Sequence, residues 1–125
     1  MKILRTLAVL SLALGAGCAP QSADFSGLFE NTLVWHVTRP DGAQQTSTFL
    51  YNEDGTVTAS QGDVTVPGTW AVKDDLNCVT VSEPDGTLED LCSHTADLDG
   101  VRPGDTWEFL LREKITIKAE LVAGR

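Results

Sequence analysis

Beyond its first residues, this 125-residue chain lacks long hydrophobic runs, and it is poor in basic side chains. The apolar segment at residues 7–14 is far shorter than the roughly 20 residues that cross a bilayer as a helix, and no later segment approaches that length. We therefore expect no transmembrane helix in the mature protein. Only 9 lysines and arginines stand against 18 aspartates and glutamates. Without a basic stripe to meet phosphates, nucleic acid is not an expected partner.

Motifs for catalysis and metal binding are also missing. No Gly-x-Ser-x-Gly hydrolase motif occurs. His36 and His94 have no nucleophile and carboxylate in a recognisable pattern around them, so we expect no enzyme activity. Cys78, Cys92 and His94 do not have the spacing of a zinc site, and the acidic stretch at residues 97–105 lacks the ligand intervals and closing Glu of a calcium loop. The sequence predicts no catalytic residue, no metal and no cofactor.

The N-terminal segment has the layout of an export signal. Lys2 and Arg5 precede the apolar segment, and small residues lead up to Cys18. A cysteine directly after small residues resembles the bacterial lipoprotein signal, in which the thiol is acylated and becomes the new N-terminus. That signal usually has leucine three residues before the cysteine, where this chain has Gly15. Cleavage sites of the ordinary kind fit worse, so we predict lipidation at Cys18.

Lipidation at Cys18 predicts both the location of the protein in the cell and its binding partner. Residues 1–17 are then a signal peptide, residues 18–23 a lipidated N-terminus and short tether, and residues 24–125 a single domain. Several acyl chains make a stable anchor, so the membrane is the expected partner, with an envelope protein as a second one. By resemblance to known sorting, Ala19 after the cysteine indicates the periplasmic face of the outer membrane. A soluble periplasmic or secreted protein is the alternative.

A repeated turn signal sets the register of the strands. Pro-Asp-Gly occurs at residues 40–42 and 84–86, and Glu-Asp-Gly at residues 53–55. Each suits a type I turn followed by a left-handed glycine, a three-residue hairpin loop. Counting from the last turn places Cys78 opposite Cys92 in a non-hydrogen-bonded pair, with α-carbons about 4.5 Å apart. Because the third cysteine is assigned to lipid, these two remain to pair in an oxidising compartment, and we predict their disulfide.

Alternation of apolar and polar residues predicts an all-β domain, preceded by one short helical turn. We expect eight short strands near residues 32–38, 44–51, 56–60, 64–72, 77–83, 87–94, 106–112 and 115–122. Joined by hairpins, they form an antiparallel up-and-down meander whose economical closure is an eight-stranded barrel without exposed edges, with a two-sheet sandwich as the alternative. Pro67-Gly68 predicts a bulge or bend in the fourth strand.

One face of these strands carries the large apolar side chains. The predicted inward set is Leu33, Trp35, Val37, Phe49, Tyr51, Val57, Trp70, Val72, Trp107, Phe109, Ile115, Ile117 and Leu121. Its six aromatic members, Trp35, Phe49, Tyr51, Trp70, Trp107 and Phe109, are candidates either for a ligand-lining wall or for the core itself. Their bulk favours the core, and predicts a filled barrel without a ligand cavity of about 300 Å³ or more.

Several short motifs resemble a family of small exported proteins of proteobacteria. These motifs are Asn31-Thr32-Leu33, Asp54-Gly55-Thr56 and Gly68-Thr69-Trp70, followed by Cys78 and Cys92. The resemblance spans residues 28–100, and the chain departs from it where Ser-His rather than an aromatic follows the second cysteine. It implies a lipocalin-like barrel and export, and the family brings no established activity.

Three classes of function remain. The first is a non-catalytic envelope lipoprotein whose barrel is a structural or interaction module. The second is a lipocalin-like carrier of a small apolar ligand, which requires a hollow interior. The third is a periplasmic inhibitor of a hydrolase such as lysozyme or a protease, which requires a definite protruding loop. The sequence shows no signature of such a loop, so the structural module is the leading hypothesis.

Overall fold

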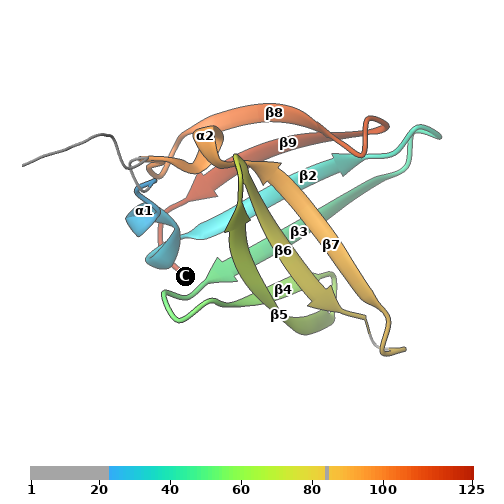
Figure 1. The fold of residues 1–125 in the computed structure, drawn as a ribbon. Helices are drawn as coiled ribbons and strands as arrows, with labels where there is room; N and C mark the ends of the chain where they lie inside the picture. The colour runs from blue at the N-terminus through green and yellow to red at the C-terminus, as the bar shows by residue number, and fades with distance from the viewer. Residues whose placement is uncertain (1–22, 84) are drawn as a thin grey trace, which may run out of the picture.

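The structure, a computed structural model, describes residues 23–83 and 85–125. Eight antiparallel strands form a nearly closed barrel (Figure 1). In chain order the elements are α1 (Ser26–Phe29), β2 (Thr32–Thr38), β3 (Gln44–Tyr51), β4 (Thr56–Gln61), β5 (Val64–Lys73), β6 (Leu76–Ser82), β7 (Leu88–His94), α2 (Thr95–Leu98), β8 (Thr106–Leu111) and β9 (Ile115–Val122). Neither helix in the described part of the chain is long and apolar enough to cross a membrane.

The predicted strands and registers are confirmed. Leu33 pairs with Phe49 across β2 and β3, and Cys78 pairs with Cys92 across β6 and β7. The predicted helical turn is α1, whereas α2 was not expected. A one-residue slip in any hairpin would have turned its apolar face outward. The registers could be predicted because the turn residues fix the length of each loop.

The three Asp-Gly turns share one local geometry. In each, the Asp Oδ1 accepts a hydrogen bond from the backbone N–H two residues later, at 2.9 Å for Asp41, 3.0 Å for Asp54 and 2.9 Å for Asp85. The glycines that follow have φ of 90°, 93° and 89°, which an L side chain rarely adopts. Hydrogen bonds from Thr56 and Thr87 hold the pKa values of Asp54 and Asp85 below the usual range.

Closure of the barrel is incomplete at one seam. The strand order β7-β6-β5-β4-β3-β2-β9-β8 leaves β7 and β8 as edges, and among the described residues no hydrogen-bonded ladder joins them. The predicted absence of exposed edges is therefore wrong. Arg112 spans the seam instead: its guanidinium donates to Glu89 Oε2 at 3.1 Å and to the Asp90 carbonyl at 2.8 Å. A segment that contains the helix α2, rather than a hairpin, connects β7 to β8.

Of the bulge or bend predicted at Pro67-Gly68, the bulge is wrong, because the β4–β5 register runs through both residues without a skip. Gly68 has a different role. A Cβ on Gly68 would lie 2.5 Å from the carbonyl oxygen of Thr80 on β6, so glycine permits the close approach of these strands.

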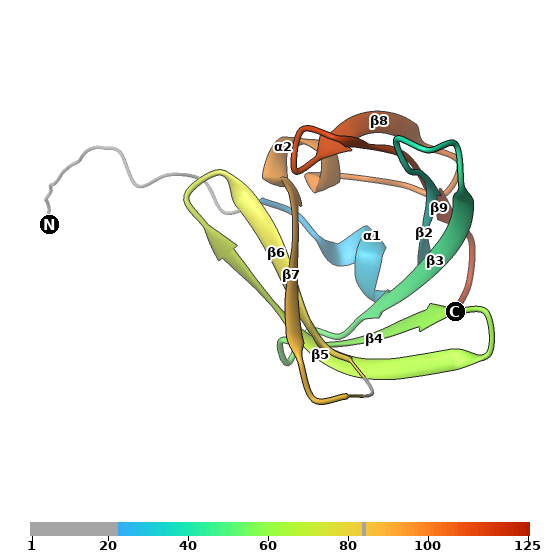
Figure 2. The ribbon, with the colours of Figure 1, turned by 90° about the vertical axis from the view of Figure 1, so that its right-hand side faces the viewer.

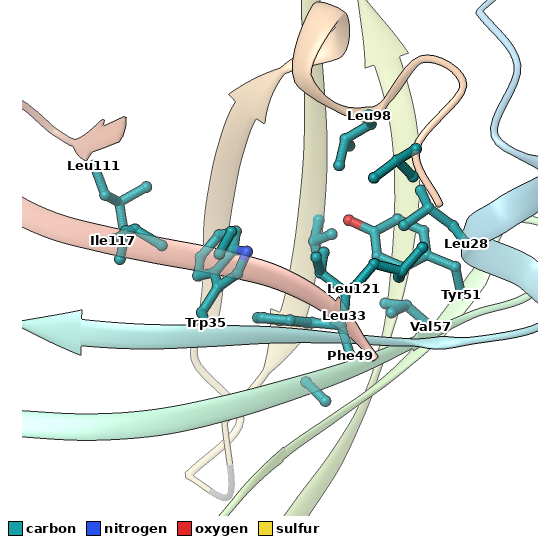
Figure 3. Close-up of a cluster of buried hydrophobic side chains, with 14 of the residues drawn as sticks. Leu28, Leu33, Trp35, Phe49, Tyr51, Val57, Leu98, Leu111, Ile117 and Leu121 are labelled. Carbon is teal, nitrogen blue, oxygen red and sulfur yellow. The ribbon is translucent and has the colours of Figure 1, made fainter. Parts of the chain in front are cut away.

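The two ends of the barrel differ. At one, here called the capped end, α1 lies across the barrel, and the strands encircle it in Figure 2. Leu28 of α1 is 1% exposed and belongs to one core cluster with Leu33, Tyr51, Leu98 and Leu121 (Figure 3). The opposite end, here called the open end, carries the β2–β3, β4–β5, β6–β7 and β8–β9 hairpins.

Candidate functional site

A cavity of about 540 Å³ lies at the open end, against the wall formed by β3 to β7. Its apolar lining is Phe49, Ala59, Val64, Val66, Val81, Leu88 and Leu91, and its polar lining is Arg39, Ser47, Ser60, Gln61, Glu83, Asp85, Thr87 and Glu89. This volume falls within the range of small-molecule sites, which often occupy the mouths of β-barrels. The prediction of a filled interior is therefore wrong at the open end.

Small side chains leave this space. Ala59, Val66 and Val81 face the interior where β4, β5 and β6 reach the open end, and none of them was in the predicted inward set. Phe49 is 2% exposed and belongs both to the core cluster and to the cavity lining, so its ring forms the boundary between the two. The apolar surface continues to the rim, where Val64 and Leu88 are 51% and 68% exposed.

The aromatic residues singled out from the sequence belong mainly to the core. Trp35 is 3% exposed and packs edge-on against Phe49 (Figure 3), with ring centroids 4.7 Å apart. It packs in the same way against Phe109, at 5.3 Å. Of the described residues that line the cavity, none is a tryptophan. Trp107 is partly buried against the core, and its indole N–H is buried without a hydrogen-bond partner.

Trp70 belongs to the capped end. Its ring packs against Phe25, Phe29 and Tyr51 at centroid distances of 5.7, 5.9 and 5.8 Å, and its indole N–H donates to the Asn52 carbonyl at 2.8 Å.

Val72, predicted to point inward, is 45% exposed, so that assignment is wrong. The pairing of β5 with β4 ends at Thr69, and beyond that residue β5 pairs with β6 alone.

A buried polar pair lies on β3 and β6. The Tyr51 hydroxyl donates to Asn77 Oδ1 at 3.1 Å, and the two residues are 1% and 0% exposed. Burial raises the pKa of Tyr51, which therefore stays protonated. Neither residue lines the cavity at the open end.

The rim of the cavity is acidic. Glu83 and Asp85 come from the β6–β7 connection and Glu89 from β7, while Arg39 lies across the mouth. The pKa of Glu83 is raised, first by a hydrogen bond with the Glu89 carboxyl, then by desolvation and by the negative charges of Glu89 and Asp85.

The remaining candidates from the sequence lie elsewhere. Cys78 and Cys92 form the predicted disulfide, with α-carbons 4.0 Å apart. His36 lies on β2 and contacts Glu120 of β9, Nε2 to Oε2 2.7 Å, with the two side chains 49% and 38% exposed. In residues 23–83 and 85–125 no three His, Cys, Asp or Glu side chains gather as metal ligands. Cys18 lies outside the described residues.

No family model, no curated protein and no solved structure matches this chain. The resemblance to exported lipocalin-like proteins stays a prediction from the sequence motifs.

Proposed function

We propose that this protein binds a small molecule in the cavity at the open end of its barrel, at the bacterial envelope. The observation that carries this proposal is the cavity of about 540 Å³, with an apolar wall and a polar rim. A structural module, the leading hypothesis from the sequence, does not require a cavity of this size. The cavity is bounded by Phe49 rather than by tryptophans, but its size and lining suit a ligand with an apolar part.

The apolar wall supplies part of the binding free energy. Burying six methylene groups contributes about 5 kcal/mol, at about 0.8 kcal/mol for each. Micromolar binding requires about 8 kcal/mol. The ligand therefore needs contacts with the polar rim in addition to its apolar part.

The anchor proposed at Cys18 fits this geometry. Asp24 lies at the capped end, where its backbone N–H donates to Asp99 Oδ1 at 2.7 Å and its carbonyl accepts from the Gly100 N–H at 2.8 Å. A tether that joins the domain at this point attaches to the end opposite the cavity. The mouth then faces away from the membrane, where a ligand reaches it freely.

Filling the cavity tests the proposal. Ala59 is 8% exposed and lines the cavity, so the Ala59→Phe variant places a ring in the ligand space, and Ala59→Leu is a milder alternative if the first fails to fold. The probe is N-phenyl-1-naphthylamine, a neutral apolar dye whose fluorescence rises on transfer out of water. We expect saturable binding to the wild type and binding at least about tenfold weaker in the Ala59 variants.

The matched control is Ala71→Phe, which adds the same ring to an exposed position of β5 outside the cavity. It should bind the dye as the wild type does. Absence of saturable binding to the wild type, or unchanged binding in folded Ala59 variants, would overturn the proposal.

A further inference from the structure

We infer that Arg112 is a positioning residue for the ligand site, which holds the cavity-lining part of β7 in place across the seam of the barrel. This inference rests on the proposed function. It assigns a role in ligand binding to a residue that does not itself line the cavity.

The wall that β7 gives the cavity is paired with a strand on one side only. Leu88, Glu89 and Leu91 line the cavity, and they lie between the β6–β7 connection and Cys92. β6 pairs with this part of β7 along one edge, whereas the other edge faces the seam, where the described residues form no ladder. The disulfide joins β7 to β6 and does not tie it to β8. The position of this wall relative to β8 therefore depends on side chains that cross the seam.

Arg112 contacts β7 within its cavity-lining part. Its Nη1 donates to Glu89 Oε2 at 3.1 Å, and its Nη2 donates to the Asp90 carbonyl at 2.8 Å. Asp90 lies two residues from Cys92, so it too is in a non-hydrogen-bonded pair with β6, and its carbonyl points toward the seam. One planar guanidinium thus holds a cavity-lining side chain and the backbone of the next residue at once.

The turn that carries Arg112 has a backbone conformation that does not suit its side chains. Arg112 and Glu113 are its central residues, with φ of 53° and 64°, and the Lys114 N–H donates to the Leu111 carbonyl at 3.2 Å. Positive φ at both central positions favours asparagine or glycine. Strained backbone of this kind is often found at functional sites. Asparagine at position 112 would relieve the strain, but its side chain is too short to reach β7.

The exposure of the ion pair separates a positioning role from a general stabilising one. The side chains of Arg112 and Glu89 are 50% and 39% exposed, and exposed ion pairs contribute little to global stability. An edge strand held by few contacts opens locally, without unfolding of the whole domain. Loss of the guanidinium should therefore change the position and exchange of β7, and with it the ligand site, more than the stability of the fold.

The Arg112→Asn variant tests this inference, because asparagine suits the turn and removes the guanidinium. We expect its midpoint of urea unfolding to stay at or above that of the wild type, while its affinity for N-phenyl-1-naphthylamine falls about fivefold. The dye is neutral, so the change in charge does not by itself weaken its binding. Hydrogen exchange at the amides of Glu89 and Leu91 should rise by about the same factor. Arg112→Gly, which suits the turn equally, is the second variant if the first fails to fold.

Two matched controls leave Arg112 in place. Glu113→Asn makes the same change at the other positive-φ position of the turn. Lys118→Gln removes a lysine from another exposed pair, in which its Nζ lies 3.9 Å from Glu108 Oε2 on the β8–β9 ladder, outside the cavity lining. Both variants should bind the dye as the wild type does.

Unchanged dye binding in folded Arg112→Asn overturns the inference, while the cavity proposal still stands on the Ala59 variants. A fall of the urea midpoint together with the affinity assigns Arg112 to the general stability of the fold and also overturns the inference. A matching loss of affinity in Glu113→Asn does the same, since the effect then belongs to the turn. Absence of saturable binding to the wild type overturns the inference and the proposed function together.

Discussion

Removing the Cys78–Cys92 disulfide, by a Cys78→Ala/Cys92→Ala double substitution, tests how the barrel keeps its edge strand. The bond joins residues separated by 14 positions, and closing a loop of about this length stabilises the fold by about 3 kcal/mol through the unfolded state. We expect the free energy of unfolding to fall by about that amount, within a range of about 2 to 5 kcal/mol. For a domain with a typical total stability of about 5 to 15 kcal/mol, this is a large loss.

The position of the bond makes the effect local as well as global. Among the described strands, β7 has a ladder with β6 alone, and Arg112 donates two hydrogen bonds to it across the seam. Without the disulfide, β7 should fray first. Because Leu88, Glu89 and Leu91 of this strand line the cavity, hydrogen exchange in β7 should rise and dye binding should weaken.

Urea unfolding at pH 7 measures the change, and a reductant provides the control. Reduced wild type should match the double variant, and reductant should have no effect on the variant. The slope of the transition should increase, because an uncrosslinked unfolded chain exposes more surface. A loss below about 1 kcal/mol would refute the reasoning, since the loop-closure entropy would then be absent.

Three other predictions use separate features. Gly68→Ala should lower the free energy of unfolding by about 1 to 3 kcal/mol, because the added methyl would lie 2.5 Å from the Thr80 carbonyl oxygen, and thermal unfolding measures it. The Asp54 carboxylate accepts hydrogen bonds from the Thr56 N–H at 3.0 Å and hydroxyl at 2.6 Å, which lower its pKa. Its stabilising contribution is therefore complete above its unfolded pKa, near 3.8, and lost as pH falls through the lowered folded value, so Asp54→Asn should flatten acid unfolding in that window. Finally, mass spectrometry of the native N-terminus should find an acylated Cys18, and an unmodified peptide that begins at Ala19 or later would contradict the anchor.

The hairpins were predictable because their information is local. Each Asp-Gly turn specifies a loop length, and the loop length fixes which residues of the two strands face each other. The pairing of Cys78 with Cys92 follows from the turn six residues after Cys78 in the same way, and parity of the cysteines supports it independently. The sequence of the two strands and the turn between them is therefore enough to predict this pairing.

The seam and the cavity depend on relations that the strand pattern does not contain. Segment 95–105, which includes α2, joins β7 to β8 without a hairpin signal, so no register brings their edges together. The residues predicted to face inward indicate how much side-chain volume fills the barrel. They do not indicate where along the barrel axis that volume lies. Trp70 packs with Phe25 and Phe29 beside α1 at the capped end, and small residues such as Ala59 remain at the other end.

The cavity must be open to water for a chain of this size to keep it. A sealed, dry cavity of about 540 Å³ would cost about 13 kcal/mol at about 24 cal/mol per Å³, which is comparable to the whole stability of a domain. An open cavity with carboxylates and hydroxyl groups on its rim stays hydrated and avoids most of that cost. Access then requires no lid, and a ligand enters by displacing water from the wall formed by Phe49, Ala59 and Val81. The packed capped end supplies the stability that allows the other end to remain open.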